Sequence, residues 1–148
     1  MEITKVKIKF FSDKAKMPVY GTKYSAGHDL YSICDEPIRI APHETLKLRT
    51  GIAMEIPEGY AGFLYARSGM ATKRGLRPAN CTGVIDSDYR GEIMVAVHND
   101  TDQLQTIEPG ERIAQLVIAP YLKVEFENVD CLEDTERGNG GFGSTGTH

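Results

Sequence analysis

The sequence predicts an all-β domain, either a sandwich or a barrel, from three observations. Short stretches alternate between apolar and polar residues with a period of two, as strands that bury one face do. Turn-forming residues separate these stretches at intervals of roughly 8–12 residues. The chain has 148 residues, which suits a single domain with a substantial core.

The first predicted strand lies near the N-terminus, where Val6, Ile8 and Phe10 alternate with lysines. We expect it to be half buried, with a cationic outer face. The alternation returns over residues 46–48, 52–56 and 93–97. The turn signals between strands are Ala41-Pro42, Pro57-Glu58-Gly59, Asn99-Asp100-Thr101-Asp102 and Pro109-Gly110.

One short helix is predicted over residues 68–73, with Ser68 as its N-cap. From about Asp134 glycine becomes frequent and the apolar periodicity ends. We therefore expect a β domain over residues 1–133 and a flexible glycine-rich arm over residues 134–148. Arg137 and Phe142 indicate a functional arm, because a purely disordered tail has no reason to carry this pair.

Charge and composition argue against several classes of function. The net charge of −4 disfavours a sequence-independent nucleic-acid binder, which needs a basic face. The sequence shows neither the apolar run of a signal peptide nor a stretch of membrane-spanning length. The three cysteines lack the spacing of a disulfide framework or a zinc site. We expect a cytoplasmic protein that binds neither nucleic acid nor membranes.

An acidic segment over residues 83–92, GVIDSDYRGE, carries the strongest functional signal. Two apolar residues, Val84 and Ile85, lead directly into Asp86. That arrangement can hold a carboxylate in a partly desolvated setting, as a general base needs. Taken alone, the same residues also suit an ordinary hairpin turn.

Four further segments accompany the acidic segment in a fixed order. They are AGHDL at 26–30, RSG at 67–69, RIAQL at 112–116 and RGNGGFGSTG at 137–146. Together the five segments resemble the motifs of the trimeric dUTPase family, over residues 25–147. The resemblance implies a jelly-roll-like β-barrel subunit with one short helix and a flexible C-terminal arm. It also implies a homotrimer whose sites are shared between subunits.

The same resemblance implies hydrolysis of dUTP to dUMP and pyrophosphate, which limits uracil incorporation into DNA and supplies dUMP for thymidylate synthesis. Asp86 would take a proton from the water that attacks the α-phosphorus. Mg²⁺ would be the cofactor, with Asp29 positioning it through water. The ring of Tyr89 would lie against the deoxyribose and exclude a 2′-hydroxyl. The other implied substrate-binding residues are Arg67, Ser68, Gly69, Asn80, Gly83, Val84, Ile85, Met94, Gln115, Arg137, Phe142, Gly143 and Ser144.

Several residues keep a second interpretation. Asp29 is expected in a tight Gly-Asp turn, where an aspartate most often caps its own backbone. Gln115 either satisfies a buried backbone group or, as the resemblance implies, contacts the phosphates. By the same resemblance, Arg112 is structural at a subunit contact. Ala66 replaces the proline that usually precedes the RSG segment in the family.

Two other functions compete with dUTP hydrolysis. A dCTP deaminase-like enzyme would need a glutamate base near the cytosine, and a dUTP-responsive binding protein would need no turnover. The uninterrupted 83–92 segment and the aromatic arm favour the dUTPase. The absence of a GxxxxGK[ST] segment excludes P-loop chemistry.

Overall fold

The computed structural model describes residues 4–141, and these residues form twelve short strands and one helix. The prediction of an all-β chain with a single short helix is therefore confirmed. No helix within the described range is long and apolar enough to cross a membrane.

The largest sheet has five antiparallel strands in the order β2-β3-β12-β7-β9. The strands are β2 (Val19–Tyr20), β3 (His28–Tyr31), β12 (Arg112–Pro120), β7 (Tyr60–Tyr65) and β9 (Gly83–Ile85). The longest strand, β12, lies at the centre and pairs with β3 along one part of its length and with β7 along another. β9, which begins the acidic segment of residues 83–92, is an edge strand of this sheet.

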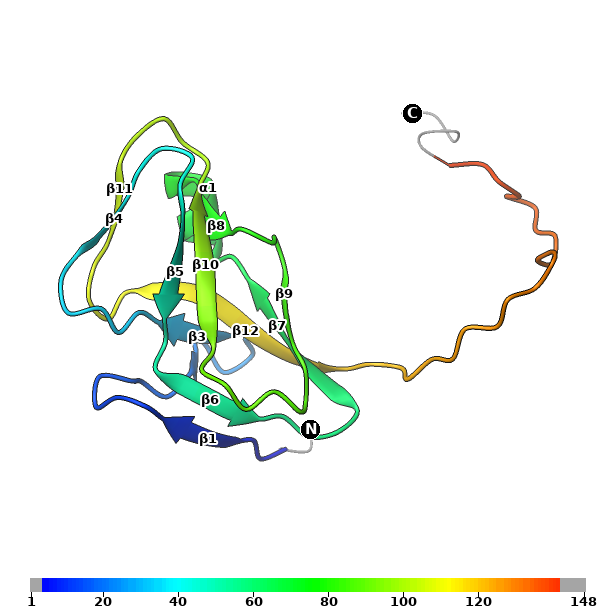
Figure 1. Cartoon of the computed structure of the whole chain (residues 1–148), viewed down its shortest axis with the longest axis horizontal. Coiled ribbons are helices and arrows are strands. Elements are labelled where there is room, and N and C mark those ends of the chain that lie inside the picture. The colour runs from blue at the N-terminus through cyan, green and yellow to red at the C-terminus, as the bar shows by residue number, and fades with distance from the viewer. Residues whose placement is uncertain (1–3, 142–148) are drawn as a thin grey trace.

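A three-stranded sheet in the order β5-β10-β8 crosses the first sheet (Figure 1). Its strands are β5 (Thr45–Arg49), β10 (Met94–Asn99) and β8 (Leu76–Pro78). Two strand pairs complete the body, β1 (Lys7–Phe10) with β6 (Ile52–Glu55) and β4 (Ile38–Ile40) with β11 (Gln105–Ile107). The predicted strands at 46–48 and 93–97 lie in β5 and β10, which pair with each other.

The core lies where the buried faces of these sheets meet. The two main sheets contribute Leu30, Leu64, Leu116, Leu48 and Val95, among others, to one apolar cluster. Each of these side chains is buried, and at Leu48 and Val95 the strand alternation turns the neighbouring Lys47 and Met94 outward.

Two predictions of half-buried strands need correction. β6 is buried on both faces, since Ile52, Ala53 and Met54 are all buried rather than alternating. β1 pairs with one edge of this strand, and the core cluster includes Ile52 and Met54. In β1, Ile8 packs against the core as expected, whereas Phe10 is 45% exposed.

Helix α1 (Ser68–Arg74) forms where the sequence predicts it, but its cap differs. Arg67 holds the N-cap position in an extended conformation, and no side chain caps the helix. Ser68 is therefore the first helical residue and not the cap. The helix ends at Gly75, whose left-handed conformation (φ 61°) lets its N–H bond to the carbonyl of Ala71.

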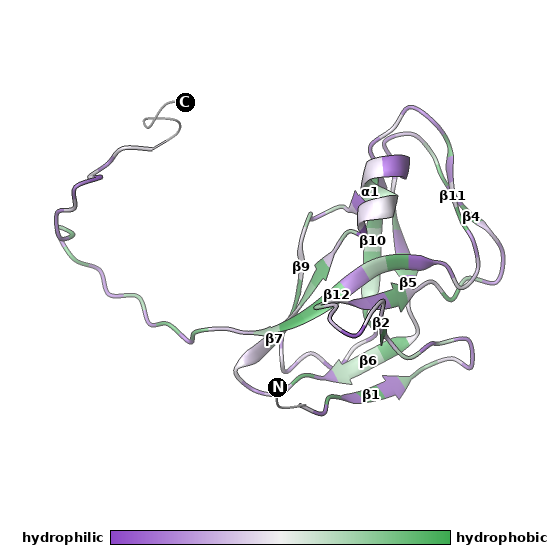
Figure 2. Cartoon of the chain, turned by 180° about the vertical axis from the view of Figure 1, so that it is seen from behind, coloured by the Kyte–Doolittle hydropathy of each residue, from purple (hydrophilic) through white to green (hydrophobic). Residues whose placement is uncertain are grey.

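Residues 121–141 leave the body after β12 and extend away from it without forming a strand (Figure 1). Apolar and polar residues alternate along the first part of this segment (Figure 2). Its apolar side chains are exposed, including Leu122 at 86% and Phe126 at 93%.

Candidate active site

A pocket of about 380 Å³ opens beside the segment that joins β9, in the five-stranded sheet, to β10, in the three-stranded sheet. Seven of the predicted site residues line it: Asn80, Gly83, Val84, Ile85, Asp86, Tyr89 and Met94. Lys47, Leu64, Glu92, Ile93 and Ala96 complete the lining. The structure therefore brings together residues that are spread over the segment from 80 to 94, with one cation, Lys47, from β5.

The exposure of Asp86 differs from the sequence prediction. Val84 is 61% exposed and Ile85 is 7% exposed, so the strand turns Val84 outward and Ile85 into the core. Asp86 follows on the outward side and is exposed in the single chain, not partly desolvated. Only one of the two preceding apolar side chains is buried, and neither shields the carboxylate.

Asp86 also begins a tight turn. The N–H of Tyr89 bonds to the carbonyl of Asp86 at 3.2 Å, and the turn places Ser87 and Asp88 at its tip. Asp88 is thus a turn residue, which fits the interpretation of the 83–92 segment as a turn. The turn also borders a wider cleft of about 740 Å³. Water can therefore reach Asp86 from two sides.

The ring of Tyr89 is held by its backbone neighbours. Its hydroxyl donates a hydrogen bond to the carbonyl of Glu92 at 3.0 Å. The ring also covers Gly91 so closely that a Cβ on this glycine would lie 2.4 Å from the hydroxyl oxygen. Glycine at 91 is what lets the ring fold back over the turn.

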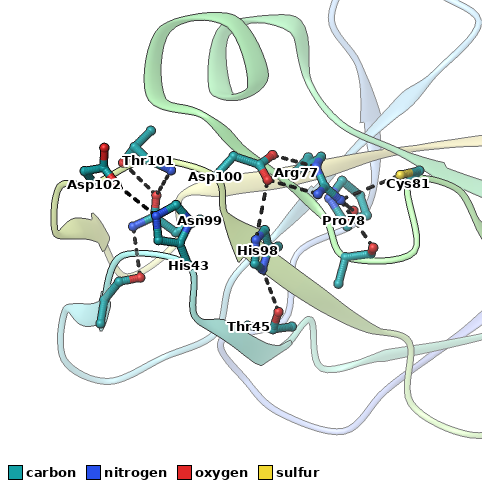
Figure 3. Close-up of polar contacts among 12 residues, drawn as sticks. His43, Thr45, Arg77, Pro78, Cys81, His98, Asn99, Asp100, Thr101 and Asp102 are labelled. Atoms are coloured by element: carbon teal, nitrogen blue, oxygen red, sulfur yellow. Dashed lines mark hydrogen bonds and ion pairs between the residues drawn. The ribbon is translucent and has the colours of Figure 1, made fainter.

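An ion-pair network at the end of β10 connects this strand to β8 (Figure 3). Arg77 binds both carboxylate oxygens of Asp100, through Nε at 2.6 Å and Nη2 at 2.9 Å. His98 approaches the same carboxylate at 3.4 Å and shares a hydrogen bond with Thr45 at 2.8 Å. The hydrogen bonds from Arg77 hold the pKa of the Asp100 carboxyl below its ordinary value, and Asp100 raises the pKa of Arg77.

The same guanidinium fixes the backbone that presents Asn80. Arg77 Nη1 donates to the carbonyls of Pro78 at 3.2 Å and Ala79 at 3.3 Å, as Figure 3 shows in part. The N–H of Ala79 bonds in turn to the carbonyl of Ala96 in β10. Asn80 thus reaches the pocket from a loop that hydrogen bonds to Arg77 and to β10 hold in place.

A second cluster brings Arg67, a predicted substrate-binding residue, together with Asp29 and Arg112. Arg67 Nε donates to Asp29 Oδ1 at 2.7 Å, and Arg112 Nη1 lies 3.3 Å from Asp29 Oδ2. Asp29 is buried within β3 and does not form the tight turn that the sequence predicts, because β3 pairs with β12 through this position. The two guanidiniums compensate the charge of this buried carboxylate. Asp29 therefore orients Arg67.

Gln115 joins this cluster from the centre of β12. Its amide donates to the carbonyl of Ala66 at 2.9 Å, which is the first of its two predicted interpretations. That bond ties down the backbone before Arg67, where the family usually carries proline. Ser68 and Gly69, next in the chain, are exposed at the start of α1.

Asp86 and Arg67 lie at opposite ends of β7. β9 pairs with β7 so that Ile85 is opposite Gly62, which places Asp86 beside Ala61. Arg67 follows the other end of the strand, beyond Tyr65. The four steps from Ala61 to Tyr65 alone span about 13 Å at ~3.3 Å per residue. One chain therefore does not bring Asp86 and Arg67 into one pocket.

Comparison with known proteins gives these features a family. The family model described as dUTPase matches residues 13–146, nearly the whole chain. The chain belongs to the dUTPase family. The pocket between β9 and β10 and the Arg67 cluster contain residues of the family segments at 83–92 and 67–69. The cluster also contains residues of the segments at 26–30 and 112–116.

Curated relatives in the dUTPase family match this chain along almost their full length. A deoxyuridine 5′-triphosphate nucleotidohydrolase of Desulfitobacterium hafniense is 49% identical, with 99% of each chain covered. One from Nautilia profundicola is also 49% identical, covering 96% of this chain and 99% of the relative.

Solved dUTPase structures have the same fold. The dUTPase of Staphylococcus bacteriophage 80alpha with dUPNHPP superposes with a TM-score of 0.89, at 34% identity, covering 98% of this chain and 100% of the other. A variant of the dUTPase from phage phi11 of S. aureus, whose structure reveals the coordination of a structural Mg(II) ion, has a TM-score of 0.80. It is 28% identical and covers 88% of this chain and 100% of the phage chain.

The predicted arm residues are only partly described. Arg137 is exposed and donates Nε to the carbonyl of Gly140 at 2.9 Å, within the segment 121–141 that extends away from the body (Figure 1). Phe142, Gly143 and Ser144 lie outside the described residues. The arm and its proposed contacts thus stay predictions.

Sequence reasoning missed three residues that build the dUTPase pocket. Lys47 lines it, Arg77 fixes the Asn80 loop, and the carboxylate of Glu92 is bound to the turn after β5. The partners of Arg77 and Glu92 lie far away in the sequence, so no local motif reveals them. Among these three residues, only Glu92 had a sequence signal, because its charge lies within the 83–92 segment.

Proposed function

We propose that this chain hydrolyses dUTP to dUMP and pyrophosphate, with Asp86 as the general base. The observation that carries the proposal is the pocket between β9 and β10, because seven of the predicted substrate-binding and catalytic residues line it together. Membership of the dUTPase family and nucleotidohydrolase relatives of the same length support the reaction. The reaction limits uracil incorporation into DNA and supplies dUMP for thymidylate synthesis.

In the proposed mechanism, Asp86 takes a proton from a water molecule that enters beside the turn. The resulting hydroxide attacks the α-phosphorus in line, the bond to the bridging oxygen breaks, and pyrophosphate leaves. The open access to Asp86 in the single chain supports a water-fed base. Substrate and the arm would then cover the carboxylate and supply the desolvation that the single chain lacks.

Uracil is read by the backbone of β9 with help from Asn80. β9 is an edge strand, so one row of its N–H and C=O groups has no strand partner among the described residues. Such groups can pair with the imide edge of uracil as with another strand. Gly83, Val84, Ile85 and Met94 form the walls, and the rigid ring of Tyr89 covers the deoxyribose and leaves no room for a 2′-hydroxyl.

The triphosphate is bound by the second cluster. Arg67, held by Asp29, offers charge-assisted hydrogen bonds to phosphate oxygens, and Ser68 and Gly69 follow it at an exposed position. Gln115 keeps a second amide hydrogen for a phosphate once its first is bound to Ala66. Together these groups offset the negative charge that develops on the leaving pyrophosphate.

Magnesium fits this site as an ion that arrives with the substrate. Across residues 4–141, no group of three or more His, Cys, Asp or Glu side chains could hold a metal. Mg²⁺ is usually bound by phosphate oxygens and waters with one or two carboxylates, and Asp29 is the carboxylate nearest the phosphate-binding residues. When bound, the ion supplies Lewis-acid stabilisation of the phosphate oxygens.

The site is completed by other copies of the chain in a homotrimer of jelly-roll-like barrels. The separation of Asp86 from Arg67 along β7 supports a site built from more than one chain. Residues 121–141 extend from the body with exposed apolar side chains, which supports packing on a neighbour. We assign residues 1–133 to the β domain and 134–148 to the arm, whose Arg137, Phe142, Gly143 and Ser144 close the site. A cytoplasmic location stays a prediction from the sequence.

The test is pyrophosphate release measured with dUTP, dTTP, dCTP and UTP, with ammonia followed in parallel. We expect pyrophosphate from dUTP at a kcat/KM well above the others, and no ammonia from dCTP. Ammonia from dCTP would favour the deaminase, and dUTP binding without turnover would favour the binding protein. The family relatives reported above favour neither alternative.

A further inference from the structure

The end of the acidic segment is fastened to the turn between β5 and β6. Glu92 Oε1 accepts the N–H of Gly51 at 2.8 Å, and Arg49 Nε lies 3.1 Å from both carboxylate oxygens. Only 13% of the Glu92 side chain is exposed. A carboxylate that accepts a backbone N–H and a guanidinium forms charge-assisted bonds, which are stronger than neutral ones.

The turn that receives Glu92 is itself fixed. Gly51 has a φ of +70°, which favours glycine, and a Cβ there would lie 3.0 Å from Ala15 and from Ile33. Beside it, Ile93 N–H bonds to the carbonyl of Ile52 at 2.8 Å. The Gly51 N–H is therefore a rigid anchor for the Glu92 carboxylate.

Glu92 connects this anchor to Tyr89. Its backbone carbonyl accepts the Tyr89 hydroxyl at 3.0 Å, while its carboxylate is bound on the opposite side by Gly51 and Arg49. The ring folds closely over Gly91, where a Cβ would lie 2.4 Å from the hydroxyl oxygen and 2.6 Å from Cζ, so it has little room to retreat in that direction. The location of the ring is thus set by the location of Glu92.

We propose that Glu92 is a positioning residue for sugar selectivity, acting through the ring of Tyr89. This inference rests on the proposed function, in which Tyr89 excludes the 2′-hydroxyl. Loss of the clamp formed by Glu92, Gly51 and Arg49 lets the residue-92 carbonyl and the Tyr89 ring shift, and UTP gains access. A small displacement of a positioned group is enough to change rates by orders of magnitude.

The experiment measures kcat/KM for dUTP and UTP in the full chain and in Glu92→Ala, Glu92→Gln, Tyr89→Ala and the double variant Glu92→Ala/Tyr89→Ala. Glu92→Ala should lower the dUTP-to-UTP ratio on the order of tenfold, as a displaced positioning group does. Glu92→Gln keeps an oxygen acceptor for Gly51 and should restore most of the ratio. In the Tyr89→Ala background, Glu92→Ala should change the ratio no further, because the group it positions is gone.

Glu44→Ala is the matched control. The Glu44 carboxylate also accepts a turn N–H, that of Ala41 at 2.7 Å, but at the other end of β5. It should leave the ratio at the wild-type value. If Glu92→Ala does not fold, Arg49→Gln tests the same clamp at a side chain that is 57% exposed, and the ratio should fall in the same direction.

An unchanged ratio in Glu92→Ala, or in Arg49→Gln where that variant replaces it, would overturn the inference. So would equal losses from Glu92→Ala with and without the Tyr89 ring. Failure of the wild-type chain to release pyrophosphate from dUTP would instead contradict the proposed function, so the two failures are distinguishable.

Discussion

The residues that carry the proposed chemistry differ in how firmly the single chain holds them. Tyr89 is fixed by a hydrogen bond and by contact with Gly91, and Arg67 by a buried carboxylate. Asp86 has only its place in the turn and is exposed. A general base in water is weak, so its surroundings must change when substrate binds. Rigid binding groups and an exposed base fit a site that is completed by closure.

Replacing Asp86 with asparagine removes the proposed base but keeps the shape of the turn. We expect the Asp86→Asn chain to fold and bind dUTP, with kcat lower by roughly 10²–10⁴-fold, the usual contribution of a positioned base. Pyrophosphate release gives kcat, and calorimetry gives dUTP binding. The control is Asp88→Asn at the tip of the same turn, which should retain most of the activity. A near-normal kcat for Asp86→Asn would move the base elsewhere.

Removing the Tyr89 ring should open the sugar pocket. Tyr89→Ala is expected to narrow the preference for dUTP over UTP, in part by gaining activity on UTP, because the rigid ring no longer occupies the space of a 2′-hydroxyl. Steady-state kinetics on both nucleotides provide the ratio. Tyr24→Ala, at a tyrosine that is 87% exposed, is the control. A ratio equal to that of the wild type would show that another group reads the sugar.

At the scale of elements, the strands were predictable where their alternation is regular. β5 and β10 fall where residues 46–48 and 93–97 predict them, and the helix begins with its predicted residue. Short strands such as β2 and β8 carry no periodic signal, because two or three residues cannot show one. The ion pairs that support the pocket were not predictable either, since their partners are brought together only by strand pairing.

The ion pair between Arg77 in β8 and Asp100 after β10 predicts that the stability of the fold depends on pH. Arg77 lowers the pKa of Asp100 from its ordinary value of 3.8, so the folded state favours the ionised carboxyl more than the unfolded state does. That stabilisation is present above the ordinary pKa and is lost as the pH falls through the lower, folded value. Stability should therefore decline on acidification partly through Asp100.

Thermal unfolding from neutral pH down to below pH 3.8 tests this coupling. Asp100→Asn should unfold at a lower temperature than the wild type at neutral pH, and the difference should shrink as the pH falls below that value. Asp130→Asn, in the segment after β12, is the control and should follow the wild-type curve. A difference in Tm that stays constant down to the acid limit would contradict the assigned role of the pair.

At the scale of the whole molecule, the sequence identified most of the pocket, whereas only the family resemblance, and no residue pattern, implied a site shared between chains. The pocket residues between Asn80 and Met94 are close in sequence and line one pocket, so their motif already indicates a common site. Arg67 follows the far end of β7, and only the strand register reveals that distance. The desolvation predicted for Asp86 also failed at this scale, because a single chain leaves the turn open. Both observations fit a site assembled from several copies.

The most direct test mixes two inactive chains. Asp86→Asn removes the proposed base, and truncation after Glu136 removes the arm, so in the proposed homotrimer neither variant alone should form a complete site. If the base and the arm of one site come from different chains of a cyclic trimer, every mixed trimer contains one intact site. Random mixing of equal amounts should then restore about a quarter of wild-type dUTP hydrolysis, from one site in each mixed trimer. No recovery, in a sample shown by mass spectrometry to contain mixed trimers, would contradict the shared site.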